Sequence, residues 1–177
     1  MIRPFDREDF DSVYSIMEKS FPRDEHRPCE EQKALLDNER YNIRVATDDG
    51  KVVAFIAYWK LEDLLYIEHF ATDPECRGRG IGAMILSDIC RENNGTVCLE
   101  VEPPESEITR RRIGFYERNG FHLNEYPYIQ PPISKGCEPV PLMIMTYKNK
   151  IDRSEFENIR DLLYKEVYKT DKKAWLS

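Results

Sequence analysis

The spacing of hydrophobic residues changes several times along the chain, and each change marks the border of a predicted element. Apolar residues three or four positions apart, such as Phe10, Val13, Tyr14 and Met17, are typical of a helix with one buried face. Runs rich in valine, isoleucine and tyrosine that are bounded by turn residues are typical of strands. The predicted helices cover residues 7–21, 29–39, 81–92, 106–120 and 154–169, and the predicted strands cover residues 2–5, 41–47, 52–60, 64–72, 96–102, 121–126 and 140–148.

The order of these elements predicts a mixed α/β (α+β) fold. The strands at 41–47 and 52–60 flank the turn sequence DDGK and form a predicted hairpin, whereas helices join other strands as crossover connections. Hairpins and crossovers together predict a mixed, largely antiparallel sheet flanked by helices. The length suits one domain over residues 1–177, with a core at about 2–148 and an extra C-terminal helix at about 151–170.

The charge balance argues against a protein whose main function is to bind nucleic acid. Lysine and arginine total 26 against 33 aspartate and glutamate residues, a formal net charge of −7, so any anion site must be local.

The five cysteines are scattered, without a CxxC pair or a histidine at metal-ligand spacing, which predicts a reduced protein without a metal site. The first residues do not resemble a signal peptide, and no window approaches the ~20 apolar residues of a membrane span. We therefore expect a soluble, cytoplasmic protein that binds neither nucleic acid nor membrane.

A cluster of glycines and arginines, RGRGIG at residues 77–82, lies between the strand at 64–72 and the helix that follows. Amide groups at a helix start lack intrahelical partners, glycines let an anion approach the backbone, and Arg77 and Arg79 add positive charge. The spacing fits neither the dinucleotide loop GxGxxG nor a Walker loop, which ends in GKS or GKT. The cluster predicts a diphosphate site, and the alternative is a tight turn with solvated arginines.

As R-x-x-G-x-G, the cluster resembles the pyrophosphate-binding motif of the GNAT superfamily of N-acetyltransferases. The order of the segments LLYIEHFAT, GIGAMILSDICRE, TVCLEVE and RRIGFYERNGF is similar to the strand, helix, splayed strand and tyrosine-bearing helix of that family. The resemblance extends over residues 2–148 and implies a GNAT-like fold with acetyl-CoA as cosubstrate. The C-terminal helix lies outside it, and we expect its apolar stripe to dock on the sheet or on a partner chain.

The resemblance also implies which residues hold the cosubstrate. The end of the strand before the loop would bind the pantetheine arm through its backbone, and the loop amides would meet the pyrophosphate. Two positions depart from the family pattern, Thr109 for asparagine and Arg112 for alanine, although Thr109 can still form a hydrogen bond. The implied cosubstrate-binding residues are Phe70, Ala71, Thr72, Arg77, Gly78, Arg79, Gly80, Ile81, Gly82 and Thr109.

Two residues are expected to move protons, Tyr116 and Glu68. Tyr116 matches the family tyrosine that protonates the departing thiolate, and the alternative is a core tyrosine on an amphipathic helix. A primary alkylammonium has a pKa near ~10, so its nitrogen must lose a proton before it can attack. Strict alternation along the strand places Glu68 on the same face as Tyr66, Phe70 and Thr72, which makes Glu68 our first choice for the general base.

Further residues bear on the acceptor site. Alternation puts His69 on the opposite face of the strand, as a packed or surface histidine. Glu100 and Glu102 share a face of the next strand, and they either attract a cationic acceptor or form a solvated strand edge. The proline-rich segment 127–138 and the adjacent Tyr126 form either a wall of the acceptor site or a packed loop.

The sequence thus predicts an N-acetyltransferase that moves an acetyl group from acetyl-CoA to a primary amine. Direct transfer in a ternary complex is favoured over a covalent enzyme intermediate, because no cysteine lies beside a histidine in the key strands. The acceptor is a small molecule or a protein amino group, and the acidic residues favour a cation. The alternative is a GNAT-like module that binds CoA or another ligand without turnover. Both a monomer and a homodimer are compatible with the sequence.

Overall fold

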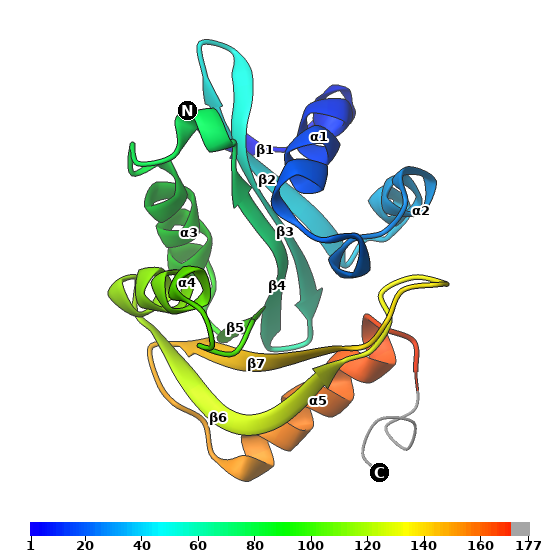
Figure 1. Cartoon of the computed structure of the whole chain (residues 1–177). Coiled ribbons are helices and arrows are strands. Elements are labelled where there is room, and N and C mark those ends of the chain that lie inside the picture. The colour runs from blue at the N-terminus through cyan, green and yellow to red at the C-terminus, as the bar shows by residue number, and fades with distance from the viewer. Residues whose placement is uncertain (171–177) are drawn as a thin grey trace.

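Seven strands form one mixed sheet in the computed structural model, which describes residues 1–170 (Figure 1). Their order across the sheet is β1-β2-β3-β4-β5-β7-β6, and every neighbouring pair is antiparallel except β4 with β5. The predicted mixed, largely antiparallel sheet is therefore confirmed. The strands are β1 Ile2–Pro4, β2 Tyr41–Asp48, β3 Lys51–Leu61, β4 Leu64–Thr72, β5 Thr96–Val101, β6 Phe121–Gln130 and β7 Val140–Tyr147.

The parallel pair opens the sheet at its centre. β4 and β5 are paired only over residues 64–67 and 96–99, after which the two strands diverge. β3 stays paired with β4 as far as Thr72, so the diverging part of β4 has one hydrogen-bonded edge and one edge without a strand partner. Backbone groups along such an edge can bond another extended chain.

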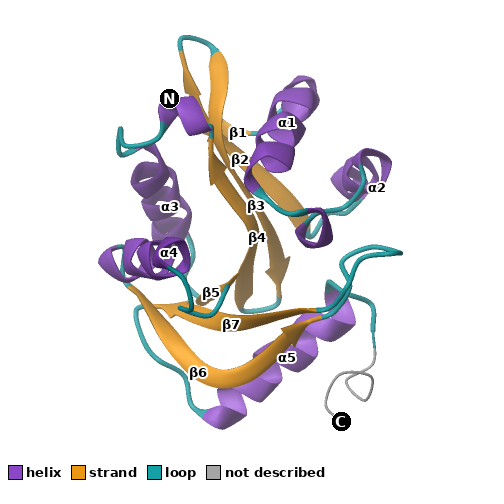
Figure 2. Cartoon of the chain, in the orientation of Figure 1, coloured by secondary structure: helices purple, strands orange, loops and turns teal. Residues whose placement is uncertain are grey.

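Helices cover both faces of the sheet (Figure 2). Met17 of α1 and Leu163 of α5 belong to a core cluster on one face, whereas Ile85 of α3 and Ile113 of α4 belong to a second cluster on the opposite face. Alternate residues of the central strand β3 supply both clusters, as its period of two requires. α2 ends at Ala34, short of the predicted residue 39. The α-helices are α1 Phe10–Ser20, α2 Cys29–Ala34, α3 Ile81–Glu92, α4 Glu107–Arg118 and α5 Arg153–Glu166.

Side-chain caps set the starts of the last two helices. The Asp152 carboxylate accepts from the Glu155 amide at 2.9 Å, and the Glu155 carboxylate accepts from the Asp152 amide at 2.8 Å. Ser106 and Thr109 form the same reciprocal box at the start of α4. An N-cap of this kind contributes about 1 kcal/mol. These local bonds explain why both helix starts agree closely with the sequence prediction.

One predicted loop belongs to a strand. β6 runs to Gln130, into the segment 127–138 that we predicted to be a loop or cover. Its pairing with β7 is interrupted between Asn124 and Tyr128. This interruption accommodates Pro127, which has no N–H group to donate to a β ladder.

The C-terminal helix docks on the sheet, which was one of its two predicted partners. Phe156 and Tyr164 of α5 pack against the ring of Tyr128 on β6. The chain then continues past α5 to Tyr168, whose hydroxyl reaches Glu100 on β5. Within residues 1–170, no helix combines the length and the apolar character that crossing a membrane requires.

Candidate active site

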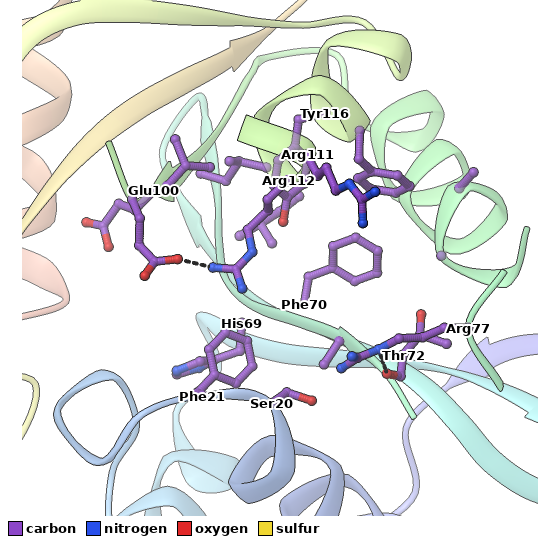
Figure 3. Close-up of a pocket in the computed structure, with 18 of the residues that line it drawn as sticks. Ser20, Phe21, His69, Phe70, Thr72, Arg77, Glu100, Arg111, Arg112 and Tyr116 are labelled. Carbon is purple, nitrogen blue, oxygen red and sulfur yellow. Dashed lines mark hydrogen bonds and ion pairs between the residues drawn. The ribbon is translucent and has the colours of Figure 1, made fainter. Parts of the chain in front are cut away.

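A cavity of about 640 Å³ occupies the region where β4 and β5 diverge. Figure 3 shows side chains from α1, β4, β5, α4 and the loop before α3 around it. Arg77 and Glu100 lie on opposite sides of this space, and Tyr116 lies between them along its upper wall. The cavity therefore brings together residues that are far apart in the sequence.

The glycine loop and the start of α3 form a basic end of the cavity. Gly80 caps α3 with a φ of 76°, and Gly78 has a φ of 79°, a left-handed backbone that glycine adopts without steric cost. Arg77 lines the cavity, and its Nε donates to the Thr72 carbonyl oxygen at 3.3 Å. A Cβ on Gly82 would lie 3.2 Å from the Thr72 hydroxyl, so this glycine lets α3 approach β4 closely. Helix-start amides beside an arginine favour an anion.

Most of the residues predicted to hold the cosubstrate line the cavity, but Arg79 and Thr109 do not. Arg79 forms an ion pair with Asp48, with 2.8 Å between Nη2 and Oδ2. The Thr109 hydroxyl accepts from the Ser106 amide at 3.0 Å and so serves the cap of α4. Both geometries favour roles other than cosubstrate binding. The lining residues from the predicted set are Phe70, Ala71, Thr72, Arg77, Gly78, Gly80, Ile81 and Gly82.

Tyr116 lies on the cavity side of α4 (Figure 3). Its ring packs near Phe70, Phe115 and Phe121, at centroid distances of 6.2, 5.4 and 5.7 Å. Burial raises the pKa of the Tyr116 phenol to about 12. The phenol is therefore protonated throughout the neutral range and can donate a hydrogen bond or a proton.

A β-bulge in β4 overturns the predicted alternation of this strand. The pairing with β3 shifts by one residue, which leaves Glu68 as an extra residue without a partner. Across the bulge the faces are exchanged, because Tyr66 and Ala71 belong to one core cluster while Ile67 and Phe70 belong to or pack against the other. The prediction that Glu68 shares a face with Phe70 is therefore wrong.

Glu68 is held in a buried ion pair. Its two carboxylate oxygens accept from the two terminal nitrogens of Arg27 at 2.9 Å, and its side chain is 1% exposed. Burial by itself would raise the pKa of Glu68, but the charges and hydrogen bonds of Arg27 and His69 lower it to about 2. His69 lies on the same side, with Nδ1 3.4 Å from a Glu68 oxygen, rather than on the opposite face. A carboxylate with so low a pKa binds a proton too weakly for efficient base catalysis at neutral pH.

Glu100 is a second acidic residue at the cavity, and its environment is different (Figure 3). Three tyrosine hydroxyls donate to its carboxylate: Tyr66 at 2.8 Å, Tyr168 at 2.9 Å, and Tyr128. Burial raises the pKa of Glu100 to about 7, although these hydrogen bonds lower it. Because these three hydroxyls enclose its carboxylate, Glu100 is not the solvated strand-edge side chain that the sequence also allowed. It can take up and release a proton near neutral pH.

Opposite charges are separated along the cavity. Arg77 and the start of α3 make one end basic, Glu25 and Glu100 make the other end acidic, and Arg111 and Arg112 of α4 lie along the wall between them. Burial raises the pKa of Glu25 as well. Glu102, predicted to lie near Glu100, forms an ion pair with Arg112 at the cavity wall. The cavity can therefore hold an anion at one end and a cation at the other.

Comparisons with known proteins agree with this geometry. A family model described as an acetyltransferase (GNAT) domain matches residues 39–123. A putative acetyltransferase from the GNAT family from Bacteroides thetaiotaomicron is 32% identical with a TM-score of 0.87, over 97% of this chain and 99% of that chain. The chain belongs to the GNAT acetyltransferase family. The family and the enzyme class predicted from the sequence are thereby confirmed.

Two further comparisons with this GNAT protein are weaker. A glucosamine 6-phosphate N-acetyltransferase of Trypanosoma brucei brucei is 33% identical over 60 residues, which cover 34% of this chain and only 39% of the relative's length. An aminoglycoside 6′-N-acetyltransferase complexed with coenzyme A has a TM-score of 0.60 at 15% identity, over 86% of this chain and 99% of that chain. The second likeness shows a shared fold alone.

Two residues of the GNAT site were missed by sequence analysis. Arg27 lies in a proline-flanked break between helices, and Tyr168 lies just beyond α5. Their partners Glu68 and Glu100 are 41 and 68 residues away along the chain. Contacts between residues so far apart leave no periodic pattern in the sequence. The sequence offered one clue to them, because a carboxylate within an apolar strand needs a buried partner.

Proposed function

We propose that the protein transfers an acetyl group from acetyl-CoA to the nitrogen of a primary amine while both substrates are bound. One observation carries this proposal: the cavity joins an anion-binding helix start, a protonated phenol and a carboxylate with a pKa of about 7. These groups suit a diphosphate-bearing thioester, a departing thiolate and an ammonium ion, respectively. Membership of the GNAT family supports the same reaction.

The residues around the cavity fit acetyl-CoA. The helix-start amides of α3 and the guanidinium of Arg77 suit its diphosphate. The unpartnered edge of β4 at residues 70–72 offers backbone groups to its extended pantetheine arm. A Cβ on Gly78 or Gly80 would meet no atom within 4 Å, so the loop leaves open space for a ligand. When bound, acetyl-CoA supplies an activated acetyl group and a sulfur leaving group.

Glu100 is the proposed proton acceptor, in place of Glu68. With a pKa of about 7, Glu100 is ionised to about half at pH 7 and can hold the proton that an ammonium ion must lose. The surrounding tyrosine hydroxyls fix the orientation of its carboxylate. The low pKa and the ion pair of Glu68 favour a structural role, in which Arg27 fastens the segment after α1 to β4.

Tyr116 is the proposed proton donor to the departing sulfur. Its phenol stays protonated because burial raises its pKa to about 12. Its position between the basic and acidic ends of the cavity is where the thioester would lie if the diphosphate occupied the helix start (Figure 3). A phenol at that point can protonate a thiolate as it forms.

Ligand-dependent unfolding and thiol release test the proposal. Acetyl-CoA should raise the unfolding temperature of the wild-type protein, whereas NADH and ATP should not, because a ligand of the folded state stabilises it by mass action. Release of free thiol should then require an added amine. Binding without thiol release, across a broad set of amines, would support the alternative of a non-catalytic CoA-binding module. No binding of acetyl-CoA to the folded protein would refute the proposal.

A further inference from the structure

The acidic end of the cavity is where an acceptor amine would bind, and its lining limits what that amine can be. Phe21 and Glu25 come from the segment after α1, and Glu100 and Gln130 come from the sheet. Figure 3 shows Phe21 and Glu100 on the side of the cavity away from Arg77. Size, charge and hydrogen-bonding capacity at this end can each be judged from the structure.

Two segments that are distant in sequence lie side by side (Figure 1), and they adjoin Glu25 and Gln130 of the cavity lining. The loop between β6 and β7, residues 131–139, forms hydrogen bonds with residues 22–31. We call this contact the bridge. Ser134 and Cys137 are buried in it. The bonds of the bridge are Ser134 Oγ to Glu31 Oε2 at 2.6 Å, the Glu138 amide to Asp24 Oδ1 at 3.2 Å, and Arg23 Nη1 to Cys137 Sγ at 3.3 Å.

The bridge bears on the size of the acceptor, because it joins the segments next to Glu25 and Gln130 of the cavity lining. The interior next to it is filled by the Arg27–Glu68 ion pair and by the tyrosines that donate to Glu100. A polypeptide acceptor must continue out of the site beyond its first residue, and a chain that leaves on this side would have to part the joined segments. A compact molecule that fits within the cavity requires no such change.

Charge at this end favours an ammonium ion and disfavours a carboxylate. Glu68 and Glu102 are each paired with an arginine. Among residues 1–170, neither Glu25 nor Glu100 has a lysine or arginine nitrogen within ion-pair distance. Negative charge therefore attracts a cation and repels a carboxylate on the same molecule.

Gln130 adds a requirement for an oxygen atom. This residue lines the cavity at the end of β6, is only 4% exposed, and has no hydrogen-bond partner for Nε2 among the described residues. Buried amide groups are nearly always hydrogen-bonded, because an unpaired one loses its water without compensation. An oxygen on the bound acceptor would supply the missing partner. A neutral hydroxyl or ether oxygen meets both this need and the charge restriction.

We infer that the acceptor is a compact primary amine with a neutral oxygen near its nitrogen, of the amino alcohol or amino sugar class. The inference rests on the proposed function. The ammonium group lies at Glu100 and the oxygen at Gln130. In the transfer, a bond forms between nitrogen and the acetyl carbon, the carbon–sulfur bond breaks, Glu100 takes the proton from the amine, and Tyr116 protonates the sulfur.

A matched pair of acceptors tests the class with wild-type protein. Ethanolamine and propylamine have nearly the same size, but one carries a hydroxyl where the other has a methyl group. We expect kcat/KM for thiol release, expressed per concentration of unprotonated amine to correct for the lower basicity of ethanolamine, to be about tenfold higher with ethanolamine, the factor for one hydrogen bond, and glucosamine to be accepted as well. Equal or better use of propylamine, spermidine, alanine or a short peptide would overturn the inference but leave the proposed function standing. Thiol release with none of these amines would overturn both.

Gln130→Leu tests the residue, because leucine keeps a similar volume and removes the donor. The preference for ethanolamine over propylamine should disappear, with KM for ethanolamine raised about tenfold. The KM values for acetyl-CoA and propylamine should not change. A folded variant that keeps the preference would overturn the assignment of Gln130. If the variant does not fold, the comparison of the two amines in the wild type still decides the acceptor class.

Discussion

Removal of the Tyr168 hydroxyl should shift the pH dependence of turnover. This hydroxyl lies 2.9 and 3.1 Å from the two carboxylate oxygens of Glu100 and 2.9 Å from the Tyr66 hydroxyl. Tyr168→Phe keeps the ring and deletes one donor to the ionised form of Glu100. Because a hydrogen bond to the charged form stabilises that form, its loss raises the pKa of Glu100.

The size of the shift follows from the bond that is lost. A hydrogen bond to a charged group contributes roughly 1.5–3 kcal/mol, and one pKa unit corresponds to about 1.4 kcal/mol. Two other tyrosines still donate to Glu100, so we take the lower limit and expect a rise of about one unit. With a wild-type pKa of about 7, the ionised fraction at pH 7 would fall from about half to about a tenth. Turnover at pH 7 should therefore fall about fivefold.

The assay is kcat for thiol release from pH 6 to pH 9.5, with saturating acetyl-CoA and amine. Tyr168→Phe should move the midpoint of the rising limb to higher pH and recover nearly full activity at the alkaline end. Tyr164→Phe is the matched control, because the Tyr164 hydroxyl donates to the Ile129 carbonyl oxygen at 2.6 Å rather than to Glu100. An unmoved midpoint in a folded Tyr168→Phe protein, or an equal shift in the control, would refute the role of Glu100 as the titrating base.

Three further changes test other parts of the site. Gly80→Asp should weaken acetyl-CoA binding by at least about tenfold in calorimetry, because it places a negative charge at the helix start; Gly50→Asp, at a φ of 77° and also with open space, controls for backbone strain. Tyr116→Phe should lower kcat by roughly 10²-fold while leaving the Kd of acetyl-CoA unchanged, and equal losses in both would contradict the role of proton donor. Glu68→Gln leaves Arg27 buried without its partner and should lower the free energy of unfolding by about 3–5 kcal/mol in urea titrations. Because the pKa of Glu68 is lowered in the folded state, the wild-type contribution is full above 4.5 and is lost as pH falls toward 2, so the difference between the two proteins should shrink over that range.

Local features of the sequence predicted the elements that carry the proposed anion site. The glycine loop, the helix that follows it and the tyrosine on α4 are all recognisable from short runs of residues, because turn chemistry, helix caps and helical periodicity depend on near neighbours. For the same reason the starts of α4 and α5 agreed closely with expectation. The structure of segment 127–138 was harder to predict, because its first residues belong to a strand only through their pairing with β7, and nearby residues do not reveal that pairing.

The proposed proton acceptor could not be identified from patterns within one strand. Strict alternation favoured Glu68, but a bulge depends on how β4 registers against β3, and no pattern within β4 reveals it. The same sequence offered two interpretations of Glu100, a group that attracts a cationic acceptor and a solvated strand edge. Only the fold places Tyr66, Tyr128 and Tyr168 around Glu100 and Arg27 against Glu68.

The sequence by itself determined the order of elements, the glycine loop before α3 and the family, because each depends on contacts between residues close together along the chain. The tertiary structure alone decided which carboxylate is neutralised by an arginine and which has its pKa raised toward neutrality by burial. It also brought residues 22–31 and residues 131–139 together in the bridge. A pKa depends on burial and on charges within a few ångströms, and segments far apart in the sequence supply both.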